Sequence, residues 1–154
     1  MIAANRTYDE ISVGDSAEIT RLCTANDLLI FAHASGNMNP LHLADNDASA
    51  KKAVAPSMWI GSLFSAVLGN KLPGVGTLYR SQTLHFHGRA HVGEELTIRV
   101  EAKEKKAEGV VLFACAITTA EGGLIADGEA EVIAPSEKIE VDLHDLPDLL
   151  LTKH

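Results

Sequence analysis

Alternation of apolar and polar residues in the second half of the chain predicts a meander of antiparallel strands. Leu96, Ile98 and Val100 are separated by polar neighbours, and residues 123–133 show the same period of two. This period indicates strands with one buried and one solvent-facing side, which is typical of antiparallel sheets. The predicted strands, separated by glycine-containing turns, span residues 76–87, 95–103, 110–119 and 123–133.

Two helices are predicted before this meander. Thr24 is a candidate N-cap for a helix that ends at Gly36, after a short strand over residues 17–23. A second helix begins near Ser57 and ends at Gly69. Its apolar residues cover nearly the whole circumference, which predicts burial on most sides. The pattern therefore predicts an α+β fold, with a curved antiparallel sheet wrapped around one buried central helix.

Composition indicates a globular, acidic protein. The 154 residues include 13 Lys and Arg against 21 Asp and Glu, for a formal net charge of −8, and 46% are hydrophobic. The length suits one domain with a substantial core, and the negative charge argues against nucleic acid or an anionic membrane as partner. Neither a signal peptide nor a membrane-spanning apolar run is found, so a cytoplasmic protein is expected. Cys23 and Cys115 lie apart in apolar segments, which predicts two buried free thiols.

The end of the chain differs from the rest. Residues 1–133 are expected to form the domain, and residues 134–154 a tail or truncated linker. This last segment is charged and contains Pro135 and Pro147. An apolar patch at 149–151 could also dock on a partner.

Two features could carry chemistry. The densest polar cluster, at 35–42, follows the first predicted helix, and its His42 could serve as a general acid or base or have only a capping or core role. The free backbone N–H groups near Ser57 and Met58, at the start of the second helix, can bind the partial negative charge of a thioester carbonyl oxygen. Alternatively, Ser57 merely caps its own helix.

A metal site is the less favoured interpretation of the histidine-rich strand. His85 and His87 would point to the same side of a strand, with His91 nearby. No cysteine or carboxylate close in sequence supports them as ligands. The Gly74-Val75-Gly76 turn lacks the third glycine and the following helix of a dinucleotide-binding loop. We therefore expect no metal and no cofactor.

Several segments carry a resemblance to a known family: FAHASGNMNPLH at 31–42, LFSAVLG at 63–69, LPGVGTLY at 72–79 and SQTLHF at 81–86. Together they resemble the MaoC-like (R)-specific enoyl-CoA hydratases. That family has the hotdog fold and acts as a dimer with its active site near the subunit interface. Residues 131–138 are similar to the end of the MaoC domain in fusions with a phosphate acetyl- or butyryltransferase. No transferase activity is expected in this chain.

The resemblance implies reversible addition of water to a trans-2-enoyl thioester of CoA or acyl carrier protein. It places the catalytic histidine at His42 and the backbone N–H that polarises the thioester carbonyl near Ser57 and Met58. The family's aspartate, five residues before the histidine, corresponds to Asn37. An amide can hold a water molecule but cannot take its proton. The expected substrate pocket also contains Asn39, Phe64 and Ser65.

Three functions therefore stay open. The first is a weak or specialised hydratase in which His42 acts as both acid and base while Asn37 holds the water. The second is a catalytically inactive hotdog module that binds an acyl thioester or serves in assembly. The third is a hotdog thioesterase, for which Asp45 or Asp47 would have to supply the carboxylate.

A homodimer or higher homo-oligomer is expected. A single helix half wrapped by one sheet leaves a broad apolar face, which a two-fold partner would cover. Trp59 and Phe64 are candidates for this protected region, or else belong to the core of one chain.

Overall fold

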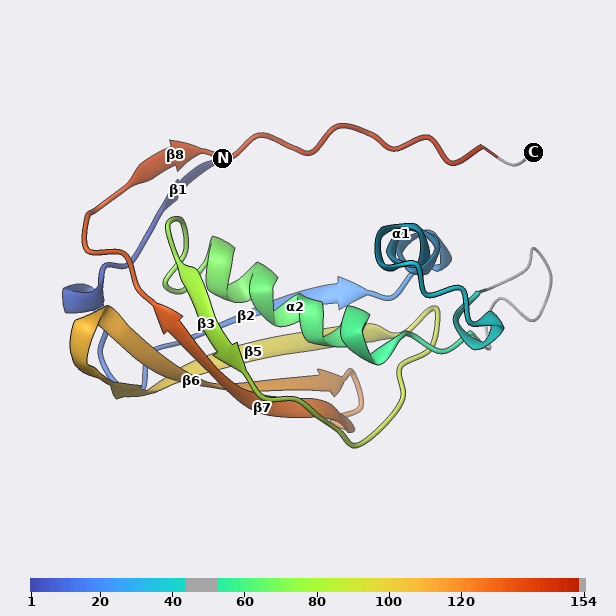
Figure 1. The fold of residues 1–154 in the computed structure, drawn as a ribbon, viewed down its shortest axis with the longest axis horizontal. Helices are drawn as coiled ribbons and strands as arrows, with labels where there is room; N and C mark the ends of the chain where they lie inside the picture. The colour runs from blue at the N-terminus through green and yellow to red at the C-terminus, as the bar shows by residue number, and fades with distance from the viewer. Residues whose placement is uncertain (44–52, 153–154) are drawn as a thin grey trace.

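The computed structural model describes residues 1–43 and 53–152, which form a curved sheet with two helices on its concave side (Figure 1). Helix α1 spans Ala25–Ser35 and α2 spans Ser57–Asn70. The strands are β1 (Ile2–Ala4), β2 (Ser16–Leu22), β3 (Leu78–Gln82), β4 (His85–Phe86), β5 (Glu95–Lys105), β6 (Val110–Thr119), β7 (Leu124–Ile133) and β8 (Glu140–Asp142). Among these residues, no helix is long and apolar enough to cross a membrane.

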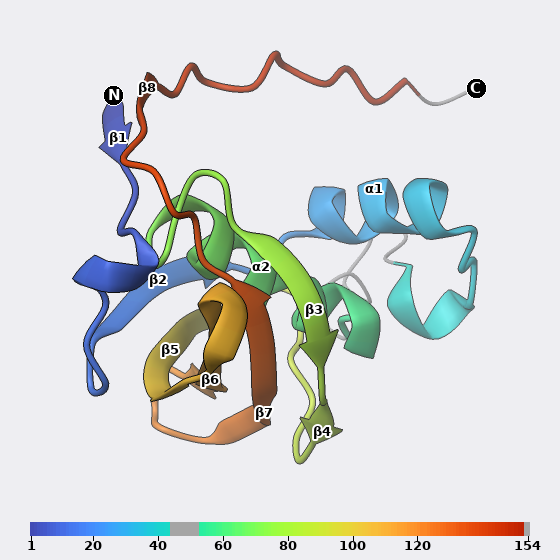
Figure 2. The same ribbon diagram turned by 60° about the vertical axis from the view of Figure 1, so that its left-hand side comes forward.

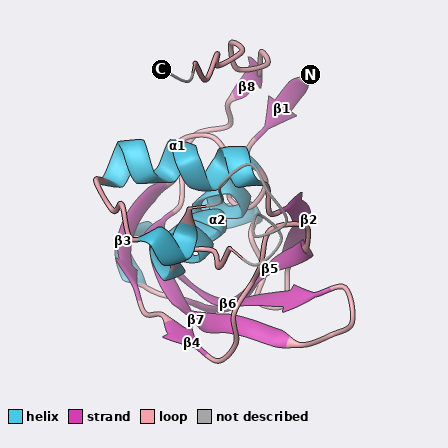
Figure 3. Cartoon of the chain, turned by 90° about the vertical axis from the view of Figure 1, so that its right-hand side faces the viewer, coloured by secondary structure: helices cyan, strands magenta, loops and turns pink. Residues whose placement is uncertain are grey.

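All strand pairs are antiparallel, and the main sheet has the order β2-β5-β6-β7-β3, with β4 also paired to β7. The sheet curls around α2, as the view along the sheet shows (Figure 3). Strand β3 is the last in this order and leaves one edge open. The predicted α+β hotdog architecture, with a curved antiparallel sheet wrapped around a central helix, is therefore confirmed.

Helix α2 supplies much of the core through one wide face. Its buried residues are Trp59, Ile60, Leu63, Phe64, Val67 and Leu68. Trp59 and Phe64 thus belong to the core of a single chain. The opposite stripe, with Met58, Ser62 and Ser65, is exposed. The expectation of burial on most sides is wrong for the single chain, because one sheet covers only one side of a helix.

The predicted boundaries of α1 are confirmed by its caps. The side chain of Thr24 accepts a hydrogen bond from the backbone N–H of Asp27 at 3.1 Å. Gly36 ends the helix with φ of 78°, a left-handed conformation that glycine adopts without a steric penalty. This turn directs the chain into the polar loop that leads to His42.

The strand predicted over 76–87 is divided into β3 and β4. At the break, the N–H of Thr83 donates to the Glu129 carbonyl, and the Thr83 hydroxyl accepts from the Glu129 N–H, both at 2.9 Å. The Thr83 carbonyl lies so close to Gly128 that a Cβ there would overlap its oxygen. Gly128 therefore allows β7 to pair with both short strands.

Replacing Gly128 by alanine is expected to destabilise the protein by about 3 kcal/mol, the upper part of the range for overpacking, because the group in conflict is backbone. Gly69→Ala is the matched control, since a Cβ at this position in α2 meets nothing within 4 Å. It should be neutral or slightly stabilising. Urea unfolding followed by circular dichroism measures both. Equal midpoints for the two variants would contradict the close approach at Gly128.

The two cysteines are buried and free, as predicted. Burial raises the pKa of Cys23 to about 11 and that of Cys115 to about 12. Both thiols are therefore protonated at pH 8 in the native protein, whereas thiols of the unfolded chain ionise from about pH 8.5. Since the unfolded state then binds fewer protons than the native state, stability should fall as the pH rises from about 9 towards 11.

Two measurements check this prediction. Native protein at pH 8 should react with a disulfide reagent far more slowly than urea-unfolded protein, which should titrate two thiols. Urea midpoints should decrease above pH 9 and be less pH-dependent in a Cys23→Ala, Cys115→Ala double variant. Rapid labelling of the native protein would show that the thiols are accessible.

The two ends of the domain form a separate ribbon. Strand β1 pairs with β8, so that Ile2 lies opposite Asp142. The buried side chain of Asn5 donates to the carbonyl of Glu137 at 2.9 Å and accepts from the N–H of Ile139 at 2.9 Å. Residues 134–142 are thus tied to the start of the chain. The domain boundary at residue 133 stays a prediction.

Candidate functional site

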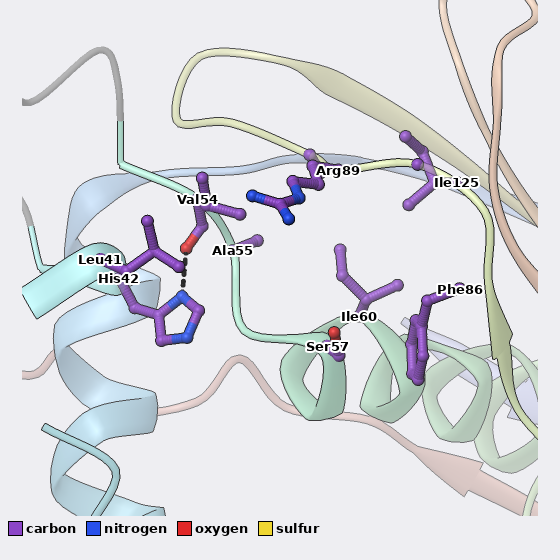
Figure 4. A pocket seen from close by; sticks show the side chains of 11 residues that line it. Leu41, His42, Val54, Ala55, Ser57, Ile60, Phe86, Arg89 and Ile125 are labelled. Atoms are coloured by element: carbon purple, nitrogen blue, oxygen red, sulfur yellow. Dashed lines mark hydrogen bonds between the residues drawn. The ribbon is translucent and has the colours of Figure 1, made fainter. Parts of the chain in front are cut away.

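A cavity of about 180 Å³ lies at the N-terminal end of α2 (Figure 4). Its lining comes from four parts of the chain: the turn after α1, the first residues of α2 with the segment before them, β4 with the loop after it, and the start of β7. These residues are Leu41, His42, Val54, Ala55, Ser57, Ile60, Phe86, Gly88, Arg89, Ala90 and Ile125. The structure therefore brings His42 and Ser57, which the sequence singled out, to one cavity.

The imidazole of His42 is oriented by a backbone group. Its Nδ1 lies 2.6 Å from the carbonyl oxygen of Val54 (Figure 4). A carbonyl oxygen can only accept, so Nδ1 must carry the proton, and in the neutral ring Nε2 is the acceptor. Val54 is itself held by its N–H, which donates to the Leu41 carbonyl at 3.1 Å. No sequence pattern indicates Val54, because its contribution is a main-chain carbonyl.

The start of α2 borders the same cavity through Ser57 and Ile60. Pro56 occupies the N-cap position and makes no side-chain cap, so Ser57 is the first helical residue rather than the cap. The N–H groups of the first helical turn have no acceptor within the helix and carry the positive end of its dipole. Ser57 lines the cavity, whereas the side chain of Met58 is exposed outside it.

Asn37 and Asn39 shape the loop that carries His42. The Asn37 side-chain oxygen accepts from the N–H of Asn39 at 3.2 Å, and the Asn39 oxygen accepts from the N–H of Leu41 at 3.2 Å. Such turns, in which an Asn side chain bonds the backbone two residues on, are a common use of this residue. Both side chains are exposed, and neither lines the cavity.

Phe64 and Ser65 also lie away from this cavity. Phe64 is fully buried in the core, and the Ser65 hydroxyl donates to the Ser62 carbonyl at 2.6 Å on the exposed side of α2. The apolar wall is formed instead by Ile60, Phe86 and Ile125. Ile60 could have been found from its position one turn after Ser57. Contact of Asn39, Phe64 and Ser65 with a substrate stays a prediction.

An arginine lines the cavity, and two histidines of the same region each contact a carboxylate. The exposed Arg89 lines it from the loop between β4 and β5 (Figure 4). His87 pairs with Asp127 at 2.9 Å, and His91 with Glu94 at 3.1 Å. In the parts of the chain that the structure describes, no three potential ligands gather around a metal position.

Comparisons with known proteins agree with this geometry. A family model described as "MaoC like domain" matches residues 10–116. The chain belongs to the MaoC-like domain family. One relative, the (R)-specific enoyl-CoA hydratase of Rhodospirillum rubrum, is 32% identical over 84% of this chain and 92% of its own length. Another, the 3-hydroxybutyryl-CoA dehydratase of Methylorubrum extorquens, is 30% identical over 85% of each chain.

Two solved hydratase structures share the fold of this chain. The unliganded R-hydratase PhaJ1 from Pseudomonas aeruginosa is 37% identical, with a TM-score of 0.93 over 99% of this chain and 100% of that chain. The (R)-hydratase from A. caviae is 33% identical, with a TM-score of 0.75 over 81% of this chain and 98% of that chain.

Proposed function

We propose that this MaoC-like chain catalyses the reversible hydration of a trans-2-enoyl thioester to an (R)-3-hydroxyacyl thioester. Relatives named as hydratases and dehydratases support this reaction class. The observation that carries the proposal is the bond between His42 Nδ1 and the Val54 carbonyl. It leaves Nε2 as a proton acceptor on a ring that lines the cavity at the start of α2.

In the proposed reaction, the oxygen of a water molecule bonds to C3 of the enoyl group while one of its protons moves to Nε2 of His42. The electron pair of the double bond shifts towards the thioester oxygen. Backbone N–H groups at the start of α2, next to Ser57, stabilise this enolate. The imidazolium then returns a proton to C2, so one water is added and His42 is restored.

Asn37 distinguishes two versions of this proposal. As an amide it can orient a water but cannot remove a proton from it. In a working hydratase, His42 would therefore perform both proton transfers. The alternative is an inactive module that binds an acyl thioester, and it is favoured by the exposed position of Asn37, whose oxygen is already bonded to the Asn39 N–H.

Hydration of crotonyl-CoA tests the proposal, because a short acyl group suits a cavity of about 180 Å³. The ultraviolet absorbance of the conjugated thioester should fall, and chiral analysis should identify the (R)-3-hydroxy product. Crotonyl linked to an acyl carrier protein should be assayed in parallel, because either carrier fits the proposed chemistry.

Other outcomes would replace this function. Binding of butyryl-CoA without turnover of either enoyl substrate would indicate the inactive module. Release of free thiol would indicate a thioesterase, whose candidate carboxylates Asp45 and Asp47 lie outside the described residues.

We further propose that the protein is a homodimer or a larger homo-oligomer. The edge strand β3 carries Leu78 and Tyr79, which are 63% and 43% exposed. The stripe of α2 with Met58, Ser62 and Ser65 is exposed as well. A second copy would cover apolar surface at both places.

A further inference from the structure

The residue whose carbonyl orients His42 belongs to a short antiparallel pairing. Val54 lies opposite His91 in an isolated bridge, where the loop between β4 and β5 passes the segment that leads into α2 (Figures 1 and 2). Two backbone hydrogen bonds, of 2.8 and 3.1 Å, flank this bridge and join residues 53–55 to residues 90–92. The segment that carries Val54 is therefore held along one side by the loop after β4.

This pairing determines where the polar backbone groups of Val54 point. In an antiparallel pair, residues that exchange hydrogen bonds across the pair alternate with residues that do not. Val54 is of the second kind, because its neighbours make the two flanking bonds, so its own N–H and carbonyl face away from residues 90–92. There the carbonyl lies 2.6 Å from Nδ1 of His42, and the N–H donates to the Leu41 carbonyl at 3.1 Å. The position of residues 90–92 therefore sets the acceptor that orients the imidazole.

A carboxylate holds residues 90–92 from their other side. By the same alternation, the N–H of His91 points away from Val54, and it donates to Oε1 of Glu94 at 2.8 Å. The ring of His91 contacts the same oxygen, which lies 3.1 Å from its Nδ1. Glu94 is anchored by its main chain, because its carbonyl accepts from the N–H of the buried Cys23 at 2.9 Å. One side chain thus connects the paired segment to a fixed point of the fold.

We propose that Glu94 is a positioning residue for His42 and acts on it through His91 and Val54, an inference that rests on the proposed hydratase function. Glu94 is not among the residues that line the cavity, so it does not touch the substrate. Its carboxylate fixes the His91 turn, the turn fixes the Val54 carbonyl, and the carbonyl keeps the proton on Nδ1 of His42. Without the carboxylate, the N–H of His91 loses this acceptor, and the imidazole loses its fixed orientation.

Glu94→Met tests this proposal, because it removes the acceptor with little change in side-chain volume. The kcat for crotonyl-CoA hydration should fall about 10-fold while KM changes by less than about twofold, since a misplaced imidazole slows proton transfer without weakening substrate binding. Glu94→Gln keeps an oxygen that can accept from the N–H of His91 and should restore kcat to within about twofold of the wild type. Glu95→Met is the matched control, because it removes an exposed carboxylate at the start of β5 and should change neither constant. A Glu94→Met variant with wild-type kcat, or a Glu94→Gln variant that is equally slow, would overturn the proposal.

Nitrogen NMR of protein with labelled histidines follows the same effect without turnover. At about pH 8, where an ordinary histidine is neutral, the ring of His42 should carry its proton on Nδ1 only, and its signals are assigned by their loss in His42→Ala. Glu94→Met should populate both tautomers, whereas Glu94→Gln and Glu95→Met should keep the wild-type pattern. An unchanged His42 ring in folded Glu94→Met would show that the carboxylate does not position it, and the proposal would fail. The ring signals decide this even if the wild type does not hydrate crotonyl-CoA, so failure of the proposed function stays distinguishable.

Discussion

Replacing His42 by alanine is expected to lower kcat/KM for crotonyl-CoA hydration by about 10²–10⁴-fold, the usual loss when a general acid or base is removed. The effect should fall mainly on kcat, because in the proposed mechanism the imidazole acts on the water and on C2 rather than on the carrier. The bond from Nδ1 to the Val54 carbonyl leaves Nε2 of His42 free to accept a proton in the proposed reaction. Stopped-flow or steady-state absorbance of the enoyl thioester measures the loss.

His33→Ala is the matched control for this experiment. His33 is an exposed histidine at the end of α1 and does not line the cavity. Its removal should leave kcat/KM within about twofold of the wild type, as for a surface substitution with no catalytic contact. Unchanged hydration in His42→Ala would remove His42 from the reaction and with it the proposed mechanism.

Asn37→Asp is expected to raise kcat by about 100-fold, the lower bound of what a positioned general base contributes. The exchange is conservative for the loop, because a carboxylate oxygen can still accept the Asn39 N–H that the amide oxygen accepts now. The new carboxylate could share the proton transfers that His42 otherwise performs alone. Rates with crotonyl-CoA should be compared at equal folded protein, checked by circular dichroism.

Asn39→Asp controls for charge in the same loop. Asn39 also bonds a backbone N–H two residues on, at Leu41, so the two variants add the same charge to similar turns. Only a change at position 37 should raise the rate. An equal rise in both variants would indicate a general electrostatic effect. No rise at position 37 would mean that His42 needs no carboxylate there. A role of position 37 in proton transfer would then be withdrawn.

Most of the fold could be predicted because its signals are local. The N-cap at Thr24 and the stop at Gly36 determine α1 through contacts within four residues. The period of two in β5 and β7 follows from burial on one side of a sheet. The division of the strand at 76–87 could not be predicted, because it depends on the distant pairing of Thr83 with Glu129 next to Gly128.

The candidate site was only partly predictable for the same reason. His42 and Ser57 were found because histidines and helix starts have recognisable chemistry in any sequence. Val54 was missed because any residue could supply its carbonyl, and Phe86 because a short edge strand carries no signal for what it faces. Phe64 faces the core and Ser65 faces solvent. Predicting which side of α2 each residue occupies would have required the position of the sheet.

The sequence by itself determined the layers of this MaoC-like protein, the ends of its helices and the burial of its thiols, since each depends on residue types and short-range periodicity. Only the tertiary structure decided which groups share the cavity, which nitrogen of His42 carries the proton, and how the chain continues after β8. These features depend on contacts between segments far apart in the chain, and no local pattern encodes the distance between them.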